Sequence, residues 1–203
     1  MTDKKISIHW FRQDLRIEDN PSLNYLSSLE EPIMCVFMLD EVNNDQKIGR
    51  ASKFFLNESL KSLNSILNNC LHLYKGCALV LFKNLLKDFK IKNISWNRCY
   101  EPWSIKRDKK IKLYLENQGV NVKSFNGSLL WEPWNVLKKD NTPYKVFSPF
   151  YKRGCLESES PRFPTKSVKL NLLKIPNDFE INKLNLLPKV DWHKKLEKIW
   201  KID

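Results

Sequence analysis

Glycine is scarce in this sequence, with five glycines among 203 residues. Neither G-x-G-x-x-G nor G-x-x-x-x-G-K-S/T occurs, which argues against the usual phosphate-binding loops. There is no G-x-S-x-G elbow, and the three histidines, His9, His72 and His193, lie in separate segments without an obvious triad. The sequence therefore argues against a hydrolase or a nucleoside triphosphatase, and it contains no recognisable set of catalytic residues.

Paired cysteines and long apolar runs are also missing. The five cysteines show no C-x-x-C spacing, and with three histidines they form no zinc signature. We interpret them as reduced thiols, and we expect no metal site. No apolar run is long enough to cross a membrane, and the chain starts without a secretory apolar region. The sequence predicts a cytoplasmic protein with no membrane association.

The sequence carries a net charge of +12. It arises from 28 Lys against 7 Arg, and it accompanies 20 Asn, a bias typical of an AT-rich coding sequence. The lysines are dispersed along the chain rather than gathered in one stripe. We therefore favour a solvated, compositionally biased surface over contact with a polyanion, which stays open as the alternative.

Apolar runs alternate with amphipathic segments over the first 155 residues. The expected strands lie at 5–11, 33–39, 72–75, 91–97 and 120–125. The expected helices lie at 21–29, 50–69, 77–89 and 103–118. This alternation predicts an α/β fold, namely a doubly wound, parallel, five-stranded sheet with helices on both faces.

The hydrophobic pattern of the sequence changes after residue 155. Prolines at positions 161, 164, 176 and 188 punctuate a stretch without sustained periodicity, and only 192–200 again has a helical pattern. We predict one α/β domain at 1–155, followed at 156–203 by an irregular inter-domain connector rather than a second core.

Three motifs carry a more specific signal. They are HWFRQDLRIEDNP at 9–21, WNRCYEPW at 96–103 with KRD at 106–108, and SFNGSLLWEPW at 124–134 with TPYKVFSPF at 142–150. A further piece, LLPKVDW, follows at 186–192. In this order and spacing the motifs resemble the N-terminal domain of the photolyase/cryptochrome family, class I photolyases in particular. The resemblance covers essentially the whole chain.

The resemblance implies a Rossmann-like domain that holds a light-harvesting antenna pigment. In the family, a C-terminal helical domain binds FAD and the pyrimidine dimer, and reduced flavin donates the electron that splits the cyclobutane ring. This sequence does not contain that half, so we expect no DNA repair by the chain alone. FAD and damaged DNA would be bound only in the intact protein, or with a separately encoded helical domain as partner.

The second motif contains the favoured pigment contact. In the family, an acidic residue at the position of Glu101 contacts the antenna, and a carboxylate suits the paired N–H donors of a pterin. The alternative is a carboxylate that only stabilises the start of the following helix. Cys99 and Tyr100 flank it as possible pocket residues, Tyr100 more as a packing residue.

Two other segments add candidates. Arg12 and Gln13 follow the first strand at the sheet edge where ligands of open α/β sheets bind. The segment that opens the helix at 50–69 also matches the family near the pigment: Ser52 is a candidate donor, and of Phe54 and Phe55 only one can face the pigment, because helical spacing turns the other to the core. We expect Phe55 to be the residue that faces the pigment.

The identity of the pigment follows from two positions. Family members that use a deazaflavin often carry Arg where this chain has Gln13 and Asp where it has Cys99. Methenyltetrahydrofolate is therefore favoured, with deazaflavin or FMN as alternatives.

Several residues have structural interpretations. We expect Trp10 and Phe11 in the core, a structural Arg–carboxylate pair involving Asp14 and Arg16, and a helix start at residues 19–21. Trp131, Pro133 and Trp134 of the third motif are expected to cap the sheet. Apolar surface should be exposed around Phe147, Phe150, Tyr151 and the connector tryptophans.

Three alternatives to an antenna domain of a photolyase stay open. The chain would otherwise be a stand-alone pigment- or nucleotide-binding module that reuses the fold, or a fragment of a cryptochrome-type light sensor. A remnant that folds but binds nothing is the third possibility.

Overall fold

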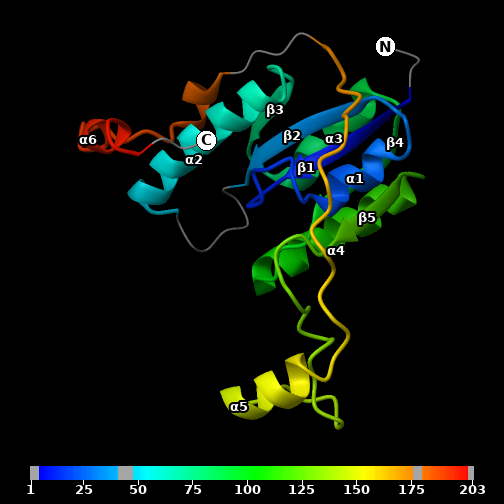
Figure 1. Ribbon diagram of the computed structural model, residues 1–203. Helices are drawn as coiled ribbons and strands as arrows, with labels where there is room; N and C mark the ends of the chain where they lie inside the picture. Colours follow the sequence, from blue (N-terminus) through cyan, green and yellow to red (C-terminus); the bar gives the residue numbers. More distant parts are fainter. Residues whose placement is uncertain (1–4, 41–47, 176–179, 201–203) are drawn as a thin grey trace.

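A single parallel sheet forms the centre of the computed structural model, which describes residues 5–40, 48–175 and 180–200 (Figure 1). Its strands are β1 (Ile6–Phe11), β2 (Ile33–Leu39), β3 (Leu71–Lys75), β4 (Ile91–Asn97) and β5 (Asn121–Phe125). Their order in the sheet is β3-β2-β1-β4-β5, and every neighbouring pair is parallel. The doubly wound, five-stranded sheet predicted from the sequence is confirmed.

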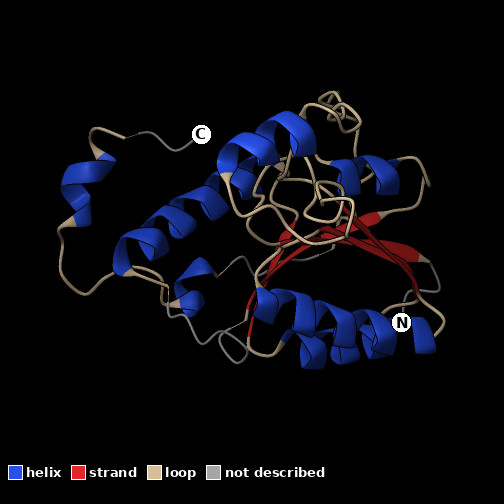
Figure 2. Ribbon diagram, turned by 90° about the horizontal axis from the view of Figure 1, so that it is seen from below, coloured by secondary structure: helices blue, strands red, loops and turns tan. Residues whose placement is uncertain are grey.

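Helices cover both faces of this sheet (Figure 2). They are α1 (Pro21–Ser27), α2 (Arg50–Ile66), α3 (Ala78–Asp88) and α4 (Pro102–Asn117). Helix α1 begins as the sequence predicts: Asn20 caps it by accepting a hydrogen bond from the Leu23 amide, and Pro21 occupies the first turn. Helix α2 ends earlier than expected, because Asn68 and Asn69 adopt left-handed backbone conformations with φ of 51° and 61°.

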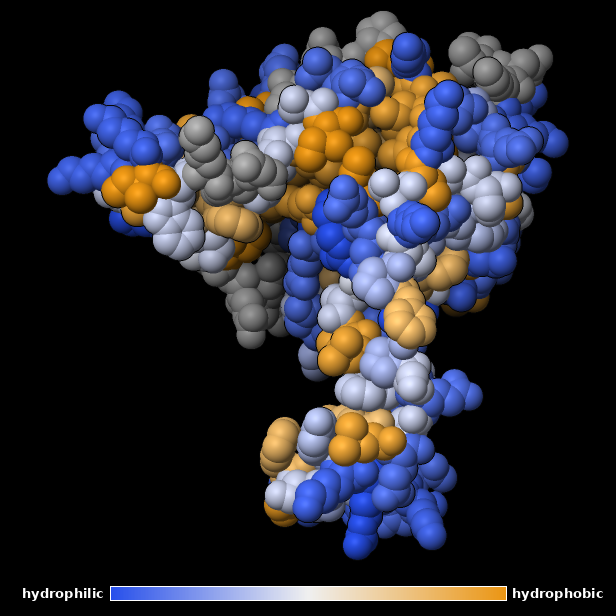
Figure 3. All heavy atoms as spheres, in the orientation of Figure 1, coloured by the Kyte–Doolittle hydropathy of each residue, from blue (hydrophilic) through white to orange (hydrophobic). Residues whose placement is uncertain are grey.

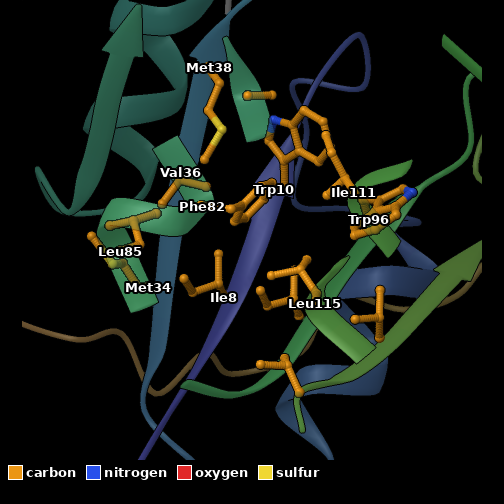
Figure 4. Close-up of a cluster of buried hydrophobic side chains, with 14 of the residues drawn as sticks. Ile8, Trp10, Met34, Val36, Met38, Phe82, Leu85, Trp96, Ile111 and Leu115 are labelled. Atoms are coloured by element: carbon orange, nitrogen blue, oxygen red, sulfur yellow. The ribbon is translucent and has the colours of Figure 1, made fainter. Parts of the chain in front are cut away.

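Two hydrophobic clusters lie on the two faces. The first joins β1, β2 and β4 to α3 and α4 and includes the buried rings of Trp10, Phe82 and Trp96 (Figure 4). The second joins β1 and β2 to α1 and α2 and contains Phe11. Trp10 and Phe11 are both fully buried, as expected, and they belong to different clusters because neighbouring strand residues point to opposite faces.

Polar side chains are also buried, under α1. His9 Nδ1 lies 2.9 Å from Ser22 Oγ, which lies 2.7 Å from Ser95 Oγ. Asn97 donates to Asn20 Oδ1 at 2.8 Å. Burial, with a smaller effect of the Arg12 charge, lowers the pKa of His9 to about 3. The imidazole is therefore neutral inside the folded domain at physiological pH.

The order of the strands determines where a ligand can bind. From β1 the chain first proceeds to β2 and β3 on one side, and later to β4 and β5 on the other. The carboxyl ends of β1 and β4 therefore diverge into helices on opposite faces, which leaves a crevice between them. The segments that follow these two strands carry the candidates Arg12, Gln13 and Glu101.

Residues 126–155 extend away from the sheet. They include α5 (Phe147–Pro149) and a short π-helix, η1 (Phe150–Cys155), which form a protruding knob with exposed apolar side chains (Figures 1 and 3). Phe147 is 72% exposed and Tyr151 is 45% exposed, as predicted. The expectation that the aromatics of the third motif cap the sheet is wrong for Trp134, which is 54% exposed. Glu132 of this motif is buried instead, and it anchors the segment through Arg98.

The segment after residue 155 lies against the α/β domain. It passes α1 and forms a parallel bridge between Leu172 and Ile33 at the start of β2. A 3-10 helix, η2 (Ile181–Leu184), buries Ile181 and Leu184 in the same cluster as β2 and α2. The last helix, α6 (His193–Glu197), follows next. The segment thus has no core of its own but contributes to that of the domain.

Two details of the first motif differ from the sequence-based interpretation. The side chains of Asp14 and Arg16 do not pair with each other: the Asp14 carboxylate accepts a hydrogen bond from Asn97 at 2.5 Å, and the Arg16 guanidinium pairs with Asp19 at 4.0 Å. Asp19 does more than start a helix, because its carboxylate also binds Arg162 of the later segment at 2.5 Å.

Candidate functional site

A cleft of about 320 Å³ opens at the carboxyl ends of β1, β2 and β4. The residues that line it come from these strand ends, from the start of α2 and from the first two turns of α4. They are Trp10, Arg12, Gln13, Leu15, Phe37, Met38, Leu39, Asp40, Ile48, Phe55, Leu56, Cys99, Trp103, Ser104 and Arg107. The cleft therefore lies where the strand order reverses, as expected for a ligand site in an open α/β sheet.

Buried charges form one wall of the cleft. Arg12 donates to the Asp108 carboxylate and to the Asn97 carbonyl oxygen. Arg107 donates to the other oxygen of Asp108 through Nε at 3.0 Å and Nη2 at 2.8 Å, and it lies 3.6 Å from Asp40. Two guanidinium groups thus face two carboxylates, and this balance allows the four groups to be buried.

Aromatic rings hold the two guanidinium groups in place. Arg12 lies 5.0 Å and Arg107 lies 4.8 Å from the centre of the Trp10 ring. Arg107 also lies 4.9 Å from the Trp103 ring. These cation–π contacts immobilise the charged groups, so the polar lining of the cleft is already ordered before any ligand binds.

Glu101 lies at the edge of the cleft and is joined to it by Gln13. Gln13 Nε2 donates to Glu101 Oε1 at 2.9 Å. The second oxygen, Oε2, is buried and has no hydrogen-bond partner in the part of the chain that the structure describes. Burial raises the pKa of Glu101, but the bond from Gln13 and the backbone amide, with a smaller effect of Ser104, outweigh it, so the pKa is lowered. Glu101 is therefore an ionised carboxylate whose Oε2 is buried at the edge of the cleft.

Helix α2 divides its two phenylalanines between the core and the cleft. Phe54 is buried and packs against Trp192 and His193 of the later segment, with ring centroids 6.1 Å and 5.5 Å away. Phe55 is 55% exposed and lines the cleft. Ser52 is exposed in the first turn of α2 and is not part of the cleft wall.

Cys99 and Tyr100 differ in position. Cys99 lines the cleft, and burial raises the pKa of its thiol, so it stays protonated at neutral pH. Tyr100 lies outside the cleft, where its hydroxyl donates to Glu132 at 2.7 Å. Burial and this bond raise the pKa of Tyr100 to about 12. Tyr100 thus holds the loop that carries Glu132, in line with a packing role.

The structure therefore brings together Arg12, Gln13, Phe55 and Cys99 in one cleft, with Glu101 at its edge. It leaves Ser52 and Tyr100 outside the cleft. The sequence analysis missed Trp103, Arg107 and Asp108, although the second motif contains them. The signal was their spacing: positions 103 and 107 share one face of α4, and that face looks toward the end of β1.

No cluster of three or more His, Cys, Asp or Glu side chains suited to a metal ion occurs within residues 5–40, 48–175 and 180–200. Across the same ranges, no helix is long and apolar enough to span a membrane.

Comparison with known proteins identifies relatives over nearly the whole chain. The family model described as DNA photolyase matches residues 7–168. A deoxyribodipyrimidine photo-lyase of Agrobacterium fabrum is 34% identical in an alignment of 202 residues that covers 95% of this chain and 41% of that protein. Cryptochrome-1 of Arabidopsis thaliana is 35% identical in an alignment of 171 residues that covers 80% of this chain and 25% of that protein.

Solved structures agree with these matches. A class III photolyase from Agrobacterium tumefaciens superimposes with a TM-score of 0.86 at 32% identity, covering 98% of this chain and 42% of that one. An archaeal photolyase from Sulfolobus tokodaii, described with two FAD molecules and a novel light-harvesting cofactor, superimposes with a TM-score of 0.70 at 26% identity, covering 89% and 41%. The chain spans about two fifths of the length of these photolyases.

Proposed function

Because the chain belongs to the DNA photolyase family, we propose that it is the antenna-chromophore-binding domain of a light-driven DNA repair photolyase. Residues 1–155 are proposed as the antenna domain and 156–203 as the connector to a FAD-binding helical domain. Repair of cyclobutane pyrimidine dimers belongs in this proposal to the intact protein, in which that helical domain binds FAD and damaged DNA. Either the same polypeptide or a separately encoded partner supplies that helical domain.

One observation carries the proposal for this chain. Glu101 presents a buried oxygen without a hydrogen-bond partner among the described residues, next to a preformed cleft. A buried acceptor that lacks a donor is costly, and a ligand with a suitable N–H group would relieve that cost. The amino-pyrimidine edge of a pterin offers two such donors side by side, which makes methenyltetrahydrofolate the favoured pigment.

The other residues of the cleft suit the rest of such a ligand. Phe55 offers an exposed ring for stacking, and Gln13 orients the Glu101 carboxylate. Arg12 and Arg107 are held by Asp108 and Trp10, so they line the cleft without an unpaired positive charge. When bound, the pigment would supply absorption of near-ultraviolet and blue light. The chain's own residues bind and orient it and limit the access of water.

The test is an absorption spectrum of the purified chain after incubation with methenyltetrahydrofolate and gel filtration. We expect a retained folate band in the wild-type chain. Glu101→Ala should weaken binding roughly tenfold or more, because it removes a charged acceptor, while Glu101→Gln should have an intermediate effect. Glu116→Ala, at the exposed far end of the same helix, is the matched control and should bind as the wild type does.

Other outcomes are equally informative. If the chain retained a deazaflavin or FMN in place of the folate, the cleft would still be the antenna site, and the pigment assigned to it would change. A folded chain that retains none of the three pigments, or a Glu101→Ala variant that retains folate fully, would refute this assignment of the cleft.

A further inference from the structure

One wall of the cleft is the start of α2, which is not part of the sheet. Phe55 and Leu56 contribute their side chains to this wall, and Ile48 lies just before the helix. The facing residues come from the ends of β1 and β2 and from α4. The width of the cleft therefore depends on what holds the first turns of α2 in place.

The local sequence does little to hold this end of the helix. Gly49 occupies the N-cap position, where it makes no side-chain hydrogen bond, and the first turn contains no acidic residue. Arg50 and Lys53 instead place positive charge at the end of the helix whose dipole is itself positive. Tertiary packing therefore has to fix the position of the first turns.

Phe54 supplies that packing. It is the only buried side chain among residues 50–56, and it belongs to neither of the two hydrophobic clusters of the described residues. The rings that contact it come from the segment after residue 155: Trp192 at 6.1 Å and His193 at 5.5 Å between ring centroids. This segment therefore covers the side chain that anchors the start of α2.

The covering segment is itself attached to the domain. Ile181, Leu184 and Leu186 are buried in the second hydrophobic cluster, together with residues of α2 and β2. From there the segment continues beside α2 to α6 (Figure 1). His193 is only 6% exposed, and its ring lies 6.0 Å from that of Trp192 at an interplanar angle of 86°. The segment is thus fixed in the core at one end and presents two packed rings to Phe54 at the other.

Phe54 and Phe55 are neighbours in one helical turn, so a shift of one moves the other unless the helix unwinds. We propose that Trp192 and His193 are positioning residues, which hold the Phe55 wall of the cleft in place through Phe54. Docking of the segment after residue 155 thereby regulates ligand binding in the cleft, and by linkage a ligand in the cleft strengthens the docking. The proposal rests on the proposed function only in taking the cleft as a ligand site.

Amide hydrogen exchange followed by mass spectrometry tests the positioning of α2 without any ligand. In Trp192→Ala the amides of residues 53–60 should exchange about fivefold or more faster than in the wild-type chain, because an aromatic contact that holds this end is lost. Amides of β1 should exchange at the wild-type rate, since Trp192 is not part of the clusters that bury this strand. Unchanged exchange at residues 53–60, or a uniform increase over the whole chain, would overturn the proposal.

Two further variants serve as controls. Trp192→Phe keeps a ring against Phe54 and should restore most of the protection from exchange. Trp200→Ala removes an indole that is 67% exposed and lies beyond α6, so exchange at residues 53–60 should stay as in the wild-type chain. If Trp200→Ala had the same effect as Trp192→Ala, the contact with Phe54 would not be the cause and the proposal would fail.

A double-mutant cycle tests the regulation of the cleft, with methenyltetrahydrofolate as the ligand. Trp192→Ala should weaken binding about threefold or more, although Trp192 does not line the cleft. The double variant Trp192→Ala/Phe55→Ala should bind no more weakly than Phe55→Ala alone, because Trp192 acts through Phe55. Additive losses in the double variant would show that Trp192 does not act through this wall.

The two measurements separate this proposal from the proposed function. If the wild-type chain retains no pigment, the proposed function fails and regulation of the cleft fails with it, while hydrogen exchange still determines whether Trp192 positions α2. If the pigment binds and exchange at residues 53–60 is unchanged in Trp192→Ala, the antenna site stands and the positioning role is refuted. In the wild-type chain, bound folate should also slow exchange at residues 193–197.

Discussion

Arg12 and Asp108 are 96 residues apart in the sequence and form a buried ion pair that joins the end of β1 to α4. Asp108 also binds Arg107, so a single carboxylate holds two guanidinium groups at the wall of the cleft. The two side chains of the pair are only 5% and 13% exposed. The arrangement of the cleft therefore depends on Asp108, although Asp108 is not among the residues that line it.

Replacing this carboxylate should destabilise the fold. Asp108→Asn leaves Arg12 and Arg107 buried with too little negative charge, and the expected loss is about 3–5 kcal/mol in the free energy of unfolding. Urea denaturation followed by circular dichroism measures it. Glu116→Gln removes a carboxylate from an exposed pair on the same helix and should cost under about 0.5 kcal/mol. Equal midpoints for the two variants would show that the buried cluster contributes no net stability.

Gly127 should not tolerate a side chain. A Cβ atom at this position would lie 2.5 Å from Cγ of Asn97, whose amide bridges Asp14 and Asn20. Gly127→Ala should therefore lower stability by about 1–3 kcal/mol, measured by thermal unfolding. Gly49→Ala is the control, because a Cβ atom there meets nothing within 4 Å. We expect a change of less than about 1 kcal/mol in that variant, and an equally small change in Gly127→Ala would contradict the close approach to Asn97.

Stability should fall as the pH falls below about 6.5, because of His9. Burial lowers the pKa of His9 to about 3 in the folded chain, whereas the unfolded chain keeps the ordinary value of 6.5. Between these values the unfolded chain binds a proton that the folded chain does not bind. The contribution of neutral His9 to the free energy of unfolding is thus fully present above pH 6.5 and is lost as the pH falls toward 3. At pH 5 the loss is about 2 kcal/mol.

The measurement is the free energy of unfolding at several pH values between 7 and 5, compared between the wild-type chain and His9→Gln. The variant should show a shallower decline. Burial also lowers the pKa of His72, so the double variant His9→Gln/His72→Gln should be flatter still. If the free energy of unfolding of His9→Gln fell with pH as steeply as that of the wild-type chain, His9 would be excluded as the source of the decline.

Asp19 should control how firmly the segment after residue 155 lies on the domain. Its carboxylate accepts hydrogen bonds from Arg162 and from the Thr165 amide, the latter at 2.9 Å. Asp19→Asn keeps a residue that tolerates the positive φ of 43° but removes the charge, so trypsin should cleave after Arg162 several times faster. Asp140→Asn, in an exposed turn, should be cleaved at the wild-type rate, and equal rates for the two variants would rule out this role of Asp19.

The sequence predicted the elements well and their long-range contacts poorly. The sequence pattern located all five strands, and Asn20-Pro21 marked the start of α1. The same reasoning could not place Trp134, because an aromatic-rich segment has the same sequence pattern whether it packs on the sheet or projects from it. Similarly, the prolines after residue 155 suggested an irregular connector and gave no sign that Ile181 and Leu184 complete the core.

The candidate site was predicted in part for a related reason. The rule that ligands bind at the carboxyl ends of strands identified Arg12 and Gln13, and the motif after β4 identified Cys99 and Glu101. Asp108 lies two helical turns into α4, where a charged residue normally faces solvent. Only the three-dimensional packing of α4 against the end of β1 shows that it is buried between two arginines.

The strand order also has a consequence for biosynthesis. β1 is made first, and its neighbour β2 follows soon after, but its other neighbour β4 begins only at Ile91. A growing polypeptide on the ribosome can therefore pair β1, β2 and β3 early, with one edge of β1 still open. The cleft needs Arg107 and Asp108, so it is completed only after β4 and the first turns of α4 have been made. Until then, the exposed edge of β1 is a site where a nascent chain is open to mispairing and to protection by a chaperone.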